Sequence, residues 1–318
     1  MTGEAQPPAP SLSDLVTQDA IIDTDIGTDI DDAYALLLAL SSPELKLRGI
    51  TLVHADIETR AKIALKLLRL AGRLDIPVVP GESHPINSER PLYWGGHEGR
   101  GLDFSDVESE VAALKTGVSA PEFIARTASE NPGRIVLIPI GPLTNVGIAI
   151  RDYPREMAQL KGIVCMGSTF QGFGLENAGI EHNIKLDPEA AQIVLGSGIP
   201  LLLVGLNVTL QTSLTEARVN ELAEKRTPLA EYIGHMTRDW FGVVGRKATC
   251  MHDPLAVAAS FAPDMVTTIP VRAGVSLNDA GSVAYFEADE SSPVRICTDV
   301  AVDRFHEVFY SRIGAAGA

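Results

Sequence analysis

Residues 20–40 read AIIDTDIGTDIDDAYALLLAL and contain the clearest indication of the fold class. The apolar start at residues 20–24 has the residue types of a buried strand, and residues 31–40 carry the apolar pattern of a helix. A buried strand that passes through a short loop directly into a helix is the first half of a β–α–β unit. The sequence therefore predicts an α/β fold.

The same alternation continues along the chain. Strands are also predicted at 47–53, 78–80, 135–140, 163–166 and 201–205, and the region 266–300 is β-rich. Helices are predicted at 58–71, 121–129, 143–151, 188–195 and 302–312, and the region 215–261 looks helical. The alternation predicts an open, mostly parallel sheet with helices on both faces, in which ligands bind at the carboxyl ends of the strands. We expect a single domain at 20–318 after a flexible tail at 1–19, with a separate lobe at 215–261 as the alternative.

The composition narrows the class of protein. The chain has 318 residues, and 26 Lys and Arg against 41 Asp and Glu give a net charge of −15, which argues against nucleic acids and anionic membranes as partners. Cys165, Cys250 and Cys297 are too widely spaced for a zinc knuckle or a disulfide framework. Glycines and a proline interrupt the uncharged stretch at 190–215, so it is not expected to span a membrane. Because no signal peptide is apparent, we expect a cytoplasmic protein.

The loop after the first predicted strand is unusually acidic. Asp23, Asp25, Asp29, Asp31 and Asp32 lie within ten residues. Carboxylates packed this closely repel one another and raise one another's pKa, so a bound cation is expected, and oxygen ligands favour Ca²⁺ or Mg²⁺. Capping of a helix N-terminus would explain Asp29 and Asp31, but it would not explain the two aspartates that precede the turn.

Two other acidic motifs fit this loop poorly. An EF-hand that began at Asp23 would need Gly at its sixth position and Glu at its twelfth, where this chain has Thr28 and Tyr34. A phosphatase of the haloacid dehalogenase type would have Thr or Val two residues after the second Asp, where this chain has Gly27. A metal-dependent phosphohydrolase stays an alternative, but no Arg or Lys that could clamp a phosphate lies between residues 23 and 45, and the remaining basic candidates, Arg60 and Lys185, are too few to support it.

The acidic loop resembles the opening motif of the inosine–uridine preferring nucleoside hydrolases, Asp-x-Asp-Pro-Gly-x-Asp-Asp. This chain departs from it by Ile26 in place of Pro and by two extra residues, so that Asp31 and Asp32 match the final pair and Asp29 is surplus. Further stretches resemble the family in the same order: residues 96–102, 140–145, 166–167, 181–183, 187–191 and 252–254. The matching stretches span about three quarters of the chain.

The resemblance implies an enzyme that hydrolyses the N-glycosidic bond of ribonucleosides with bound calcium, on a nucleoside hydrolase fold. It implies calcium ligands at Asp25, Asp32, Asp253 and the backbone carbonyl of Ile140. Asp25 would also be the general base for the attacking water, Asp23 would orient the ligands, and His252 would be the acid that protonates the leaving base. Residues implied to contact the nucleoside are Asp31, His97, Met166, Glu181, Asn183 and Asp253.

Two further residues are expected at the site. Asp56 lies where the family has an Asn, and it could hydrogen-bond to the attacking water or to Asp25. Trp240, in a helical pattern twelve residues before His252, could stack on the base or could be a core residue. Because of Asp56 and the insertion at Asp29, a catalytically silent nucleoside-binding relative is the alternative function. The family also implies a homodimer or homotetramer, and the preferred base stays open.

Overall fold

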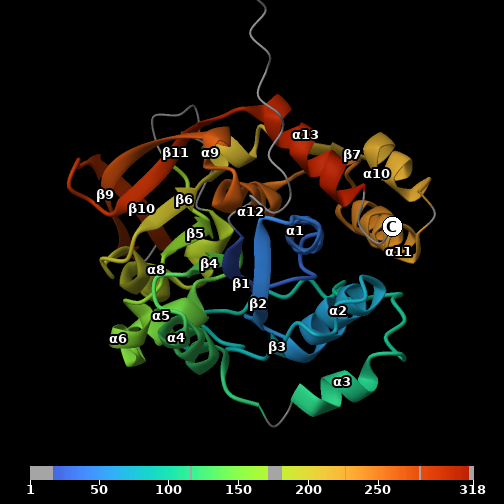
Figure 1. The fold of residues 1–318 in the computed structure, drawn as a ribbon, viewed down its shortest axis with the longest axis horizontal. Helices are drawn as coiled ribbons and strands as arrows, with labels where there is room; N and C mark the ends of the chain where they lie inside the picture. Colours follow the sequence, from blue (N-terminus) through green and yellow to red (C-terminus); the bar gives the residue numbers. More distant parts are fainter. Residues whose placement is uncertain (1–16, 115–116, 171–180, 226, 279–280, 315–318) are drawn as a thin grey trace, which may run out of the picture.

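A nine-stranded sheet forms the centre of the molecule (Figure 1). The computed structural model describes residues 17–114, 117–170, 181–225, 227–278 and 281–314. The strand order is β10-β9-β11-β6-β5-β4-β1-β2-β3. All neighbouring pairs are parallel except β11–β9 and β9–β10. The strands are β1 (Gln18–Thr24), β2 (Leu45–Leu52), β3 (Val78–Val79), β4 (Ile135–Pro139), β5 (Gly162–Met166), β6 (Leu201–Val204), β9 (Val266–Asn278), β10 (Gly281–Ala288) and β11 (Val294–Val300).

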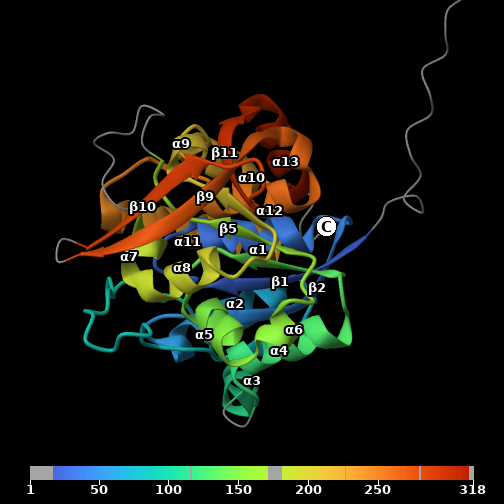
Figure 2. The same cartoon turned by 90° about the vertical axis from the view of Figure 1, so that its left-hand side faces the viewer.

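Helices cover both faces of the sheet (Figure 2). They are α1 (Asp31–Leu40), α2 (Ile57–Leu70), α3 (Glu108–Ala113), α4 (Ala120–Glu130), α5 (Thr144–Asp152), α6 (Pro154–Met157), α7 (His182–Leu186), α8 (Pro188–Leu195), α9 (Leu206–Thr209), α10 (Glu216–Ala223), α11 (Pro228–Val244), α12 (His252–Phe261) and α13 (Val302–Ile313). One buried core includes side chains of α1, α11, α12 and α13, and the other includes side chains of α4, α5 and α8. The predicted α/β architecture is therefore confirmed.

The structure corrects some predicted boundaries. Helix α1 begins and ends where it was predicted, but β1 begins at Gln18, inside the predicted tail. Residues 1–16 of that tail lie outside the described residues. The region 215–261 is not purely helical, because β8 (Ala248–Cys250) pairs with β7 (Ser213–Thr215) in a small antiparallel sheet. Side chains of α11 share a core with α1, so this region packs against the main sheet layer. None of the helices in the described ranges has the length and apolar content of a membrane span.

The register of the sheet brings the ends of β1 and β4 together. Asp23 pairs with Pro139, and the next residue of the β4 chain, Ile140, donates its backbone N–H to the Asp23 carbonyl at 2.8 Å. The loops that follow then touch, and a Cβ at Gly141 would lie only 2.8 Å from the backbone nitrogen of Asp25. Glycine is therefore required at this close approach, which places the acidic loop against the loop after β4.

Candidate active site

A cavity of about 180 Å³ lies at the carboxyl ends of β1, β4 and β5. Its lining comes from the loops after these strands and from the starts of α1, α7, α9 and α12. The lining residues are Asp25, Thr28, Asp29, Asp31, Asp32, Ile140, Met166, Glu181, His182, Asn183, Leu206, His252 and Asp253. The structure thus gathers residues that are more than 200 positions apart in the sequence around one hollow, as expected for an open parallel sheet.

Three buried aspartates form the most compact part of this cavity. Each of Asp31, Asp32 and Asp253 offers a carboxylate oxygen, and these atoms lie within 4.8 Å of one another. The first two lie in the first turn of α1 and the third in the first turn of α12, where the helix dipoles favour negative charge. The backbone N–H of Asp253 also donates to Oδ2 of Asp31 at 3.3 Å.

The raised pKa values of the three aspartates indicate that their charged forms need a cation nearby. Burial, reinforced by neighbouring carboxylates, raises the pKa of Asp31 to about 8, and it also raises the pKa values of Asp32 and Asp253 well above their ordinary range. A hard divalent cation would remove this penalty, because it favours the charged form of each carboxylate and prefers oxygen ligands. The donor set therefore fits such a metal ion.

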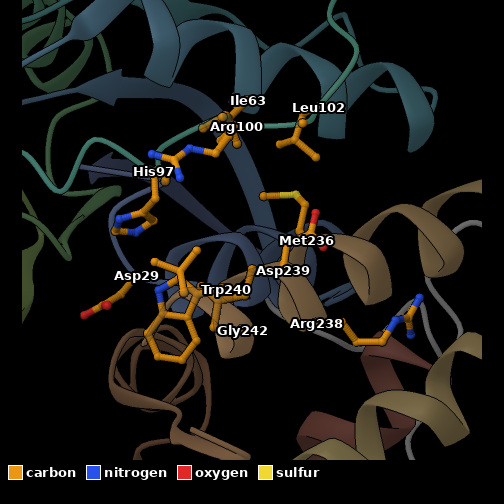
Figure 3. Close-up of a pocket in the computed structure, with 15 residues that line it drawn as sticks. Asp29, Ile63, His97, Arg100, Leu102, Met236, Arg238, Asp239, Trp240 and Gly242 are labelled. Carbon is orange, nitrogen blue, oxygen red and sulfur yellow. The ribbon is translucent and has the colours of Figure 1, made fainter. Parts of the chain in front are cut away.

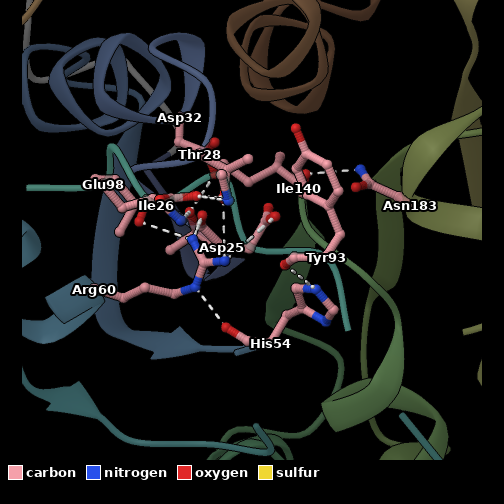
Figure 4. Close-up of polar contacts among 12 residues, drawn as sticks. Asp25, Ile26, Thr28, Asp32, His54, Arg60, Tyr93, Glu98, Ile140 and Asn183 are labelled. Atoms are coloured by element: carbon pink, nitrogen blue, oxygen red, sulfur yellow. Dashed lines mark hydrogen bonds and ion pairs between the residues drawn. The ribbon is translucent and has the colours of Figure 1, made fainter. Parts of the chain in front are cut away.

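The predicted metal ligands all reach this cavity, but they are not equivalent. Asp32 and Asp253 belong to the compact group, whose third member is Asp31, whereas Asp25 lines the cavity outside that group. The carbonyl of Ile140 accepts a hydrogen bond from Nδ2 of Asn183 at 2.8 Å (Figure 4). Because a carbonyl oxygen has two lone pairs, one acceptor position is left for a metal.

Asp23 lies behind the cavity and does not line it. Its Oδ1 accepts hydrogen bonds from the Thr51 hydroxyl and from Nδ2 of Asn145, the latter at 2.7 Å. Its Oδ2 is buried without a hydrogen-bond partner among the described residues, and burial raises the pKa of Asp23 to about 7. Asp23 therefore joins β1 to β2 and α5 directly beneath the acidic loop.

The residues expected to bind ribose are partly used by the protein itself. Glu181 caps α7, and its carboxylate accepts backbone hydrogen bonds from Ser168, Asn183 and Ile184. Asn183 lies next to Met166, whose Sδ is 3.5 Å from Nδ2. These three predicted residues, Met166, Glu181 and Asn183, border one side of the cavity.

His252 has a different environment from the one that its predicted acid role assumed. Its Nδ1 is 2.7 Å from the hydroxyl of Thr209. Burial, with a smaller contribution from Arg246, lowers the pKa of His252 to about 4, not near the ordinary value of about 6.5 that was assumed for an acid. The imidazole is therefore neutral at neutral pH.

Figure 3 shows the residues that line a second cavity, of about 450 Å³. It adjoins the first cavity, because Asp29 lines both. Trp240 and His97 border this second cavity. Trp240 Nε1 donates to the Thr28 carbonyl at 3.1 Å, and His97 Nε2 lies 2.8 Å from the same oxygen. Trp240 is mostly buried, as its core alternative expects, and it also lines the cavity, so its stacking on a base stays a prediction.

Asp56 is not in the site, which corrects its predicted role. It is exposed and caps α2, where its carboxylate accepts hydrogen bonds from the backbone and the hydroxyl of Thr59. The chain turns sharply just before it, since His54 and Ala55 have φ of 70° and 57°. The buried residue at this turn is His54, whose Nε2 lies 2.9 Å from the carbonyl of Tyr93.

Several residues of the site were missed by the sequence analysis. Thr28, His182 and Leu206 line the acidic cavity without a predicted role. The first two were inside recognised motifs, so position alone could have suggested them, whereas nothing local distinguishes Leu206. The larger omission is Arg60, which was considered only as a phosphate clamp and lies buried beside the acidic loop.

Comparisons with known proteins give a consistent result. A family model described as inosine-uridine preferring nucleoside hydrolase matches residues 20–307. The chain is 35% identical to uridine nucleosidase 1 of Arabidopsis thaliana, over 78% of this chain and 75% of that one. It is 34% identical to the pyrimidine-specific ribonucleoside hydrolase RihA of Salmonella paratyphi A, over 80% and 83% of the two chains.

Solved structures agree with these relatives. A purine-preferring ribonucleoside hydrolase from Gardnerella vaginalis superposes with a TM-score of 0.80 at 26% identity, and the match covers 94% of this chain and 99% of that one. A plant nucleoside hydrolase matches with the same TM-score, identity and coverage.

Proposed function

The chain belongs to the inosine-uridine preferring nucleoside hydrolase family and is an enzyme that hydrolyses the N-glycosidic bond of ribonucleosides, and we propose that it does so with calcium held at the acidic cavity. The observation that supports this proposal best is the convergence of buried carboxylates from α1 and α12 at the carboxyl ends of the strands. The proposed calcium ligands are Asp25, Asp32, Asp253 and the carbonyl of Ile140. When bound, calcium supplies a fixed positive charge that lowers the pKa of an adjacent water and attracts the ribose diol.

In the proposed mechanism, one aspartate activates the attacking water and another positions the ribose. The Asp25 carboxylate lines the cavity and accepts the proton of the attacking water as general base. Asp31 and Asn183 hold the ribose hydroxyls so that the anomeric carbon faces this water, and Glu181 and Met166 close the other side of the sugar pocket. The reaction passes through a transition state in which positive charge develops on the ribose, and the surrounding carboxylates stabilise that charge.

His252 would contact the leaving base. Because its pKa is lowered to about 4, His252 is neutral at neutral pH and acts by donating a hydrogen bond to the base. If Thr209 donates to Nδ1, the ring proton lies on Nε2, which is then free to point into the cavity that His252 lines. The base itself would extend towards the second cavity, where Trp240 and His97 lie.

The alternative of a phosphohydrolase has no support at this site. Arg60 donates to the backbone carbonyls of Asp25 and Ile26 and lines neither of the two cavities. Among the described residues, no arginine or lysine lines the acidic cavity to clamp a phosphate in the way that such enzymes need, and Arg100 and Arg238 line only the second cavity.

Some biological properties are also proposals. We propose a role in nucleoside salvage in the cytoplasm, which is supported by the reaction and by the free state of Cys165, Cys250 and Cys297. A homodimer or homotetramer is proposed from the family resemblance.

The test is the release of free base from uridine, cytidine, inosine, adenosine and p-nitrophenyl riboside, with calcium and with excess chelator. Calcium-dependent release from the natural nucleosides is expected, and the rates will rank the bases. Full activity in excess chelator would refute the metal role, and no release from the whole panel would favour the silent nucleoside-binding alternative.

A further inference from the structure

Arg60, on helix α2, is the largest completely buried side chain of the described residues. Burial of an arginine is costly unless its charge and its donors are matched by partners. This residue lines neither the acidic cavity nor the second cavity, so it does not touch a substrate bound in either of them. Arg60 is therefore expected to have a role other than substrate binding.

The donors of Arg60 are shared between two loops at the carboxyl end of the sheet (Figure 4). Nη1 donates to the backbone carbonyls of Asp25 and, at 3.0 Å, Ile26. Nη2 donates to the Thr28 hydroxyl at 3.2 Å, and Nε donates to the His54 carbonyl at 2.6 Å. The planar guanidinium thus holds the acidic loop after β1 against the turn after β2.

Both of the loops need such support. Gly27, in the acidic loop, has a φ of 112°. His54 and Ala55 take left-handed conformations, which are unfavourable for residues other than glycine. Arg60 satisfies the carbonyls beside these turns, which would otherwise be buried and unpaired. It also forms a 3.9 Å ion pair from Nη2 to Oδ2 of Asp25.

The flat face of the guanidinium makes one more contact. The ring of Trp94 lies 5.3 Å from the guanidinium carbon. Trp94 belongs to the same loop as His97 and Glu98, and these two contact Thr28 through its carbonyl and its hydroxyl. Arg60 therefore also links the acidic loop to the loop that covers it.

We infer that Arg60 is a positioning residue that fixes the Asp25 carboxylate for water activation and cation binding. This inference rests on the proposed function, because it assigns Arg60 a role through Asp25. Lysine cannot replace arginine in this role, since an ammonium group carries the charge but cannot reach the acceptors on both loops with one rigid fork.

The test compares Arg60→Lys with Arg69→Lys, a matched control on the same helix whose arginine pairs with Glu110 away from the site. For R60K we expect kcat for the best nucleoside to fall about 10–100-fold with KM changed less than about threefold, because a group that orients the reacting side chain is displaced. R69K should retain the wild-type kcat.

A second readout does not depend on turnover. Calorimetric titration of calcium into the metal-free proteins should show an affinity about tenfold weaker for R60K than for the wild type and R69K. Wild-type kcat and calcium affinity in a folded R60K would overturn the inference. If no wild-type nucleoside turnover is found, the proposed function fails, while the calcium titration still tests Arg60.

If R60K does not fold, Trp94→Leu replaces it. This variant removes the ring on the guanidinium and leaves all the donors of Arg60 in place. We expect kcat to fall about three- to tenfold with unchanged KM, since one cation–π contact is lost. An unchanged kcat for W94L would count against the inference in that case.

Discussion

Replacing Gly141 by alanine tests how tightly the two central loops are packed. A Cβ at Gly141 would lie 2.8 Å from both the backbone nitrogen and Oδ1 of Asp25, and 2.9 Å from Cγ1 of Val53. Favourable contacts between heavy atoms begin near about 3.5 Å, so one loop must move by roughly 0.6–0.7 Å. The backbone nitrogen cannot rotate away, and the displacement therefore falls on the loop that carries Asp25 or on the loop that carries the Ile140 carbonyl.

The magnitude of the effect follows from this displacement. Overpacking of this kind costs about 1–3 kcal/mol in the free energy of unfolding. A misplacement of nearly 1 Å at the reacting groups lowers kcat by roughly 100-fold. The loss of activity should therefore greatly exceed what the small loss of stability can explain at assay temperature.

The assay measures kcat, KM and Tm of G141A beside the wild type and Gly117→Ala. Gly117 is a fair control because a Cβ there would meet only the carbonyl of Leu114, at 3.6 Å, and it lies outside both cavities. A G141A enzyme with wild-type kcat and Tm would refute the reasoning, since it would mean that the loops do not approach each other as described.

Three further predictions concern the acidic cavity. Asp25→Asn should lower kcat by about 10²–10⁴-fold while circular dichroism stays unchanged, because the general base is lost; substantial remaining turnover would argue against that role. Replacing His252 by Phe should slow uridine or inosine far more than p-nitrophenyl riboside, whose leaving group needs no proton donor, and equal losses on both substrates would remove His252 from leaving-group assistance. The metal-free protein should lose stability as pH rises from about 4 to about 8. Folding raises the pKa of Asp31 from 3.8 to about 8, so the folded state binds more protons than the unfolded state in this pH range. A rise in pH therefore favours the unfolded state. Calcium should therefore raise Tm more at pH 8 than at pH 5, and Asp31→Asn should flatten the dependence in chelator; a Tm that rises with pH in the metal-free protein would contradict this explanation.

The local elements and the chemical types of the site could be predicted from the sequence. The apolar run at 20–24 and the helical pattern at 31–40 predicted β1 and α1, because strand burial and helix periodicity are recorded in neighbouring residues. The density of aspartates at 23–32 indicated a cation site for the same local reason: carboxylates a few residues apart cannot avoid one another's charge.

The sequence did not indicate which of these residues meet in space, because that depends on how distant segments pack. Asp253 lies 222 residues from Asp31, and it reaches that residue because α1 and α12 both begin at the same edge of the sheet. The exposed position of Asp56 also depended on context, because two left-handed residues turn the chain before α2 and leave Asp56 as its cap. The buried role of Arg60 is set by the carbonyls of loops from two different strands. Such contacts are determined by the packing of parallel strand ends, and no pattern of neighbouring residues records them.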